Sequence, residues 1–123
     1  MNFKSLGLAL IAANALAVSV SAHHSQGNYQ MTEYTQLSGT VTEVHIRNPH
    51  SWVYVEVMDE AGQPAVWVLE AKGVTALAGL GITQDNIAVG DSISARCHKL
   101  RDGSNGCLLG FLTSADGVER EWD

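Results

Sequence analysis

The stretch LSGTVTEVHIRNPHSWVYVEVM, residues 37–58, decides the fold of this 123-residue chain. Its second half, His50–Met58, alternates valines with larger or polar side chains, which is the period-two pattern of a strand with one face in a core. Its first half, Leu37–Arg47, carries apolar residues on one parity and then, from about Glu43, on the other. That switch predicts a β-bulge, which would let a long strand coil around a barrel.

Three further strands and one helix follow. Ala65–Glu70 is predicted as a third strand, and Lys72–Leu80 has the apolar spacing of a short helix. Ser92–His98 and Cys107–Thr113 are predicted as the fourth and fifth strands. Three strands, a helix and two strands is the order of a five-stranded barrel of the oligonucleotide/oligosaccharide-binding (OB) type. We therefore predict an all-β, OB-like barrel with one helix between the third and fourth strands.

The first 22 residues have the composition of a signal peptide. Lys4 supplies a positive charge, Leu6–Val18 is mostly apolar, and Val20 and Ala22 are small residues at the −3 and −1 positions of a cleavage site. The apolar run is short for a membrane span, which needs about 20 residues. We expect cleavage after Ala22 and a periplasmic or secreted protein that does not associate with the membrane; an uncleaved N-terminal anchor is the alternative.

The rest of the chain is expected to form one domain with two flanking segments. Residues 23–36 are predicted as an extended N-terminal segment, 37–114 as the barrel and 115–123 as a polar C-terminal tail. The formal net charge of −6 becomes −7 when the single lysine of the signal peptide is removed. Nucleic-acid binding is not expected, because phosphate recognition needs clustered lysines and arginines.

Cys97 and Cys107 are the two cysteines of the chain. An even count in an exported protein suggests a disulfide. The residues between them are rich in turn formers, and a hairpin folded about Asp102 would place the two cysteines opposite each other. Their spacing is unlike Cys-x-x-Cys, so a structural bond is favoured over a redox-active one.

A pair of histidines follows the predicted cleavage site. Cleavage after Ala22 would leave His23 with a free α-amine beside His24, and such a compact nitrogen donor set suits Cu(II) or Ni(II). His50 directly follows Pro49 and precedes a strand, so its position is expected to be rigid. We predict a metal site, Cu(II) favoured, formed by His23, His24 and His50. The alternative is that the first two bind metal only adventitiously and His50 caps a turn.

A second candidate site is aromatic. Trp52 and Tyr54 alternate with valines and are expected to point away from the core, and Trp67 and Glu70 on the next strand could join them. Aromatic residues on that face are where this class of barrel binds ligands. The face could therefore bind a peptide, a glycan or a protein partner, unless the N-terminal segment or the helix covers it.

Catalysis has little support in the sequence. The serines lack a Gly-x-Ser-x-Gly context, and no specific pair of carboxylates is brought together by the pattern. His45 and His98 have the outward parity of ordinary surface histidines. We expect a binding module for a metal ion or small ligand rather than an enzyme.

Several short motifs occur along the chain in a fixed order. They are His23-His24-Ser25, Leu37–Val41, Asn48–Val55, Trp67–Glu70, Val89–Asp91 and Asp102–Asn105. In combination they resemble a bacterial family of small exported proteins with no assigned function, marked by a His-His-Ser start after the signal peptide and a central Asn-Pro-His-x-Trp motif. The resemblance covers nearly all of the mature chain and implies an exported, single-domain β-protein without implying a reaction. The cysteine pair and the last ten residues depart from that pattern.

Overall fold

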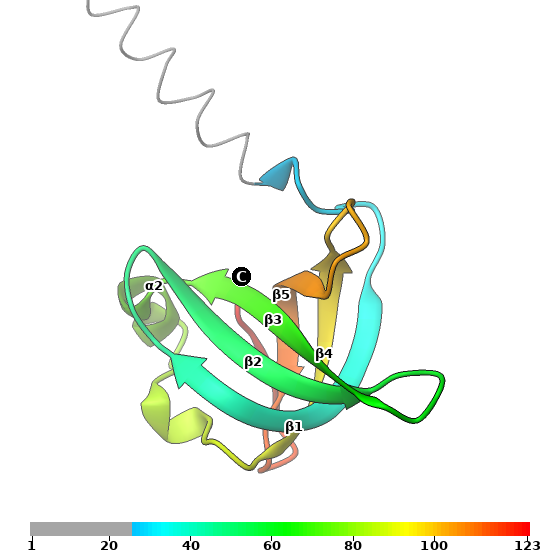
Figure 1. Cartoon of the computed structure of the whole chain (residues 1–123). Helices are drawn as coiled ribbons and strands as arrows, with labels where there is room; N and C mark the ends of the chain where they lie inside the picture. Colours follow the sequence, from blue (N-terminus) through cyan, green and yellow to red (C-terminus); the bar gives the residue numbers. More distant parts are fainter. Residues whose placement is uncertain (1–25) are drawn as a thin grey trace, which may run out of the picture.

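A computed structural model describes residues 26–123, which form one six-stranded sheet that closes on itself (Figure 1). The elements are β1 (Thr35–His45), β2 (His50–Met58), β3 (Pro64–Lys72), α2 (Val74–Gly79), the 3-10 helix η1 (Gln84–Asn86), β4 (Ser92–Lys99), β5 (Gly106–Thr113) and β6 (Glu119–Glu121). The strand order is β3-β2-β1-β4-β5-β6, and a parallel pairing of β3 with β5 closes the first five strands into a barrel. The predicted five-stranded barrel, with one helix between its third and fourth strands, is confirmed. The predicted signal peptide, residues 1–22, lies outside the described residues.

The long first strand bends around the barrel at the predicted place. The first half of β1 pairs with β4 and its second half pairs with β2. The β1–β2 register shifts between Val41 and Glu43, which is the β-bulge expected from the sequence. Gly39, just before the bulge, lies so close to β2 that a Cβ there would overlap the carbonyl oxygen of Glu56. The bulge and the glycine together allow β1 to serve both sides of the barrel.

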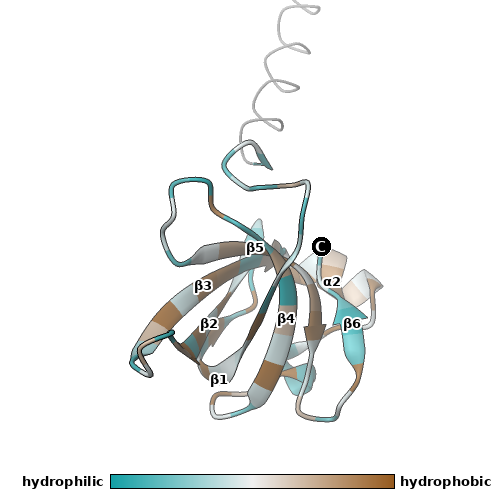
Figure 2. Cartoon of the chain, turned by 90° about the vertical axis from the view of Figure 1, so that its right-hand side faces the viewer, coloured by the Kyte–Doolittle hydropathy of each residue, from teal (hydrophilic) through white to brown (hydrophobic). Residues whose placement is uncertain are grey.

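Alternation along the strands builds the core, as the banded colouring of the strands in Figure 2 shows. Val53 and Val55 of β2 and Leu109 of β5 are fully buried, and Leu77 of α2 joins the same cluster. The inward residues come from all five barrel strands. In residues 26–123, no helix has the length and apolar character needed to cross a membrane.

The C-terminal segment is part of the barrel rather than a polar tail. β6 pairs with β5 in antiparallel register, and Trp122 is 0 % exposed within the core cluster. The backbone of Trp122 accepts a hydrogen bond from Lys72 and donates one to Gly110. One large buried side chain, with no apolar pattern around it, therefore fixes a segment that looks polar in the sequence.

The predicted disulfide is present. Cys97 of β4 and Cys107 of β5 are joined across the hairpin, with their Cα atoms 5.5 Å apart. Both cysteines are fully buried. The bond links the two strands next to the turn that connects them.

Candidate functional site

One row of paired residues crosses the outer surface of the barrel, and we call it the outer row. It consists of His98 in β4, Leu108 in β5, Glu70 in β3, Trp52 in β2 and His45 in β1. Residues opposite each other in neighbouring strands project from the same face of the sheet. The row therefore brings together side chains that lie far apart in the sequence.

The segment 26–34, which we call the N-terminal arm, lies across one end of this row. Tyr29 forms an isolated β-bridge with Leu100, and the backbone N–H of Gln30 donates to the carbonyl of Lys99 at 2.8 Å. Figure 1 shows the arm beside the loop between β4 and β5. The arm is thus docked on the barrel by strand-like hydrogen bonds.

Tyr29, Glu70 and His50 form a chain of polar contacts under the arm. The Tyr29 hydroxyl donates to Oε2 of Glu70, and the other carboxylate oxygen, Oε1, lies 3.1 Å from Nδ1 of His50. Tyr29 is 7 % exposed, and burial, followed by the hydrogen bond to Glu70, raises the pKa of its phenol. A neutral phenol donates and a carboxylate accepts. Glu70 therefore accepts a hydrogen bond from Tyr29 and lies within ion-pair distance of His50.

The contact with Glu70 involves one of the two ring nitrogens of His50. Nδ1 is the ring nitrogen that lies beside Oε1 of Glu70, so Nε2 is the ring nitrogen that this carboxylate does not engage. The side chain of His50 is 46 % exposed, whereas that of Glu70 is 13 % exposed. His50 is thus a half-exposed imidazole with one ring nitrogen beside a largely buried carboxylate.

A cavity of about 260 Å³ lies beside these groups. Its polar lining consists of Gln26, Tyr29, His50, Glu70, Lys72 and Asp123. These residues come from the arm, from β2 and β3, and from the segment after β6. Gln26, the first described residue, lines the cavity, so the arm leads directly into it.

The described residues supply only part of the predicted metal site. Within residues 26–123, no three side chains of His, Cys, Asp or Glu are close enough together to hold a metal ion. His23 and His24 lie outside the described residues. His50 is placed at the cavity, with Glu70 as its partner.

The predicted aromatic face is only partly assembled. Trp52 and Tyr54 are half-buried on the outside of β2, and Trp52 is opposite Glu70 in the register. Trp67 instead pairs with Val55 and packs against the core. Side chains three positions apart in a strand point to opposite faces, so Trp67 cannot share a face with Glu70. The structure brings Trp52, Tyr54 and Glu70 together and leaves Trp67 on the other face.

The two remaining histidines differ in environment. His45 is half-exposed, with Nε2 2.7 Å from Oε1 of Glu43. His98 is only 8 % exposed, so its predicted surface position is wrong. Its parity is outward, but the N-terminal arm covers it.

Several residues of the site are not recognisable from the sequence pattern. Tyr29 falls in a segment that reads as polar and without periodicity, and Leu108 and Asp123 reach the cavity only through tertiary structure. The one available signal was the presence of two tyrosines, Tyr29 and Tyr34, in that polar segment. Large aromatic side chains in a polar segment indicate that it packs against something.

Taken together, these features define a small closed β-barrel with a Tyr–Glu–His chain at the edge of an outer cavity. The chain belongs to DUF6152, a family of unknown function whose model matches residues 11–109. The match supports the prediction of an uncharacterised domain, and its range includes Tyr29, His50 and Glu70. No curated protein and no solved structure matches the chain.

Proposed function

We propose that this protein is an exported binding module that holds one metal ion, Cu(II) favoured, through His23, His24 and His50. The observation that carries the proposal is the 3.1 Å contact between Nδ1 of His50 and Glu70. Histidines that ligate metals nearly always donate their other ring N–H to a carboxylate, a carbonyl or water, which orients the ring and raises its basicity. His50 has a carboxylate 3.1 Å from Nδ1, which leaves Nε2 as the nitrogen for a metal ion in this proposal.

The remaining donors are within reach by chain length. Gln26 lines the cavity with His50, and His23 and His24 come three and two residues earlier in the chain. An extended chain advances at most about 3.6 Å per residue, so the Cα of His23 is within about 11 Å of that of Gln26. With cleavage after Ala22, an α-amine, an amide nitrogen and imidazoles would be available beside His50. Nitrogen donors in a square-planar or tetragonal arrangement suit Cu(II).

Two features support export. The first 22 residues have a signal-peptide composition with small residues at the expected cleavage positions. The Cys97–Cys107 disulfide fits the same proposal, because structural disulfides persist mainly in oxidising compartments. We place the mature protein in the periplasm or outside the cell.

Calorimetric titration with Cu(II) tests the metal site on mature protein that begins at His23. We expect about one ion per chain, and a loss of about tenfold or more in affinity for His50→Ala and for a chain with one glycine added before His23. His45→Ala is the matched control, because it removes a half-exposed histidine elsewhere on the barrel, and it should bind as the wild type does. If His50→Ala and the extended chain both keep wild-type affinity, the proposal fails.

The second candidate function is binding of a peptide, a glycan or a protein partner on the outside of β2. It is favoured by the partial exposure of Trp52 and Tyr54 on the same strand. Capture of a partner from periplasmic extract by metal-free protein, and its loss with Trp52→Ala, would support this function. Val66→Ala, on the neighbouring strand and 49 % exposed, is the control. A partner list that is the same for all three proteins counts against the aromatic face.

A further inference from the structure

We infer that His98 is a positioning residue: it holds the N-terminal arm against the barrel, with Gln26 at the cavity beside His50, and so sets the affinity of the proposed metal site. The metal part of this inference rests on the proposed function. The part that concerns the arm rests on contacts within residues 26–123 and has its own measurement. His98 itself lies at the far end of the outer row and does not line the cavity.

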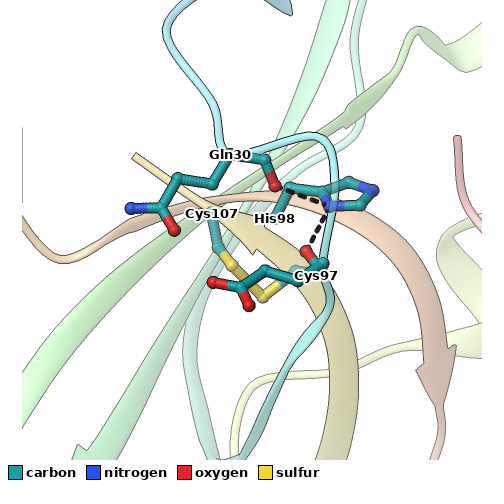
Figure 3. Close-up of a disulfide and its surroundings, with 5 residues drawn as sticks. Gln30, Cys97, His98 and Cys107 are labelled. Carbon is teal, nitrogen blue, oxygen red and sulfur yellow. Dashed lines mark hydrogen bonds between the residues drawn. A yellow bond between two sulfur atoms is a disulfide. The ribbon is translucent and has the colours of Figure 1, made fainter. Parts of the chain in front are cut away.

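The ring of His98 is wrapped by the arm. Its Nδ1 lies 3.1 Å from the carbonyl oxygen of Gln30 and 2.6 Å from that of Glu33. Figure 3 shows Nδ1 facing the backbone of Gln30. Carbonyl oxygens only accept, so Nδ1 carries the hydrogen that both share. The ring also stacks on Tyr34, with the ring centroids 4.3 Å apart. One buried side chain therefore holds both ends of the turn in the arm.

The backbone at His98 is constrained by the neighbouring disulfide. Cys97 directly precedes His98, and its disulfide partner, Cys107, precedes Leu108, which pairs with His98. All four residues are at most 8 % exposed. The disulfide thus fixes the two strands at the end of the outer row where the arm is attached (Figure 3).

The same arm carries the contacts that lead to the cavity. Tyr29, directly before Gln30, reaches Glu70 through its hydroxyl, and Gln26 lines the cavity. When two ligands to one ion are on the same chain, binding of the first leaves the second at an effective concentration that the linker between them sets. This effective concentration falls as the linker becomes longer and more flexible. Loss of the His98 contacts would release the arm from the barrel and so lengthen the flexible linker before β1. The affinity for copper should fall although no ligand is altered.

Two isosteric substitutions separate this role from a general effect on folding. His98→Asn places an amide N–H near the position of Nδ1, whereas His98→Gln places it near Nε2, for which the structure gives no bond to the arm. We expect His98→Gln to weaken Cu(II) binding by about tenfold and to change the electron paramagnetic resonance spectrum of the bound ion. His98→Asn should restore affinity to within about threefold of the wild type, with the wild-type spectrum.

A metal-free measurement tests the arm directly. The backbone N–H of Gln30 donates to Lys99, so its hydrogen exchange reports whether the arm is docked. We expect faster exchange of Gln30 in His98→Gln than in His98→Asn, with unfolding midpoints showing that both barrels remain folded. If neither variant folds, Tyr34→Ala, which removes the stacking partner and is 50 % exposed in the wild type, replaces them and should likewise speed exchange and weaken binding.

The outcomes keep the two proposals apart. Equal copper affinity and equal Gln30 exchange in wild type and His98→Gln overturn the inference, while the loss of binding in His50→Ala would still stand for the metal site. If the wild type itself binds no copper, the proposed function and the metal part of the inference fail together. The exchange rates then decide the remaining part: faster exchange in His98→Gln supports the anchoring of the arm, and unchanged exchange overturns it.

Discussion

Replacement of Trp122 by alanine measures how much the last residues of the chain contribute to the free energy of unfolding of the barrel. The side chain of Trp122 is 0 % exposed and packs in the main core cluster. Its indole N–H has no hydrogen-bond partner within residues 26–123, so the substitution removes packing rather than a polar contact. Truncation of a buried tryptophan to alanine costs about 3–5 kcal/mol. A domain of this size has a free energy of unfolding of about 5–15 kcal/mol, so the loss is a large fraction of it.

The effect is measured by urea and thermal unfolding followed by circular dichroism. For a domain of up to 100 residues, 1 kcal/mol shifts the melting temperature by about 4–8 °C, so Trp122→Ala should lower it by at least about 12 °C. Val118→Ala, in the same segment and 47 % exposed in the wild type, is the matched control and should stay within about 0.5 kcal/mol. A Trp122→Ala protein within about 1 kcal/mol of the wild type would refute the assignment of Trp122 to the core.

Three further changes test the arm, the disulfide and the bend in β1. The pKa of Tyr29 is raised, first by burial, so above about pH 10 the unfolded chain loses a proton that the folded chain keeps, and the free energy of unfolding should fall. Urea unfolding at several pH values should show a weaker fall for Tyr29→Phe. Joint replacement of Cys97 and Cys107 by alanine should lower the free energy of unfolding by about 3 kcal/mol in the loop-entropy model for a separation of 10 residues. Gly39→Ala should be strongly destabilising in thermal unfolding because the new Cβ meets backbone, whereas Gly79→Ala, with open space around it, should be neutral or slightly stabilising.

Each of these predictions has a result that would contradict it. Parallel pH curves for the wild type and Tyr29→Phe would mean that the phenol titrates normally in the folded protein. An unchanged unfolding midpoint in the double cysteine variant would mean that the disulfide does not constrain the unfolded chain. Equal stabilities of the two glycine variants would contradict the close approach of β1 and β2.

The strands and the bulge could be predicted because the alternation of apolar side chains along the sequence marks the face of each strand that is buried in the core. Alternation in His50–Met58 marks one buried face, and the β2 bounds agree with the prediction residue for residue. The parity switch near Glu43 marks the bulge for the same reason. Trp67 shares the parity of Leu69, which places both side chains on the inner face, so its aromatic character alone does not indicate the outer face.

The site was less predictable, because its contacts join distant parts of the chain. Tyr29 and Glu70 are 41 positions apart, and neither flanking sequence signals the other. The parity of His98 correctly gives an outward direction, but parity carries no information on what covers that surface. Trp122 stands alone among polar residues, so no periodic pattern reveals its burial. His50 could be chosen because its place between a proline and a strand is a local property.

The N-terminal arm can dock only after β4 and β5 have been synthesised and folded. His98, which binds the carbonyls of both Gln30 and Glu33, lies 68 positions after the first and 65 positions after the second. A chain that emerges N-terminus first therefore exposes its arm long before β4 and β5 exist to receive it. The cavity beside His50 can close only when synthesis and folding have passed those strands, so fragments that stop earlier would carry the histidines without the platform that orients them.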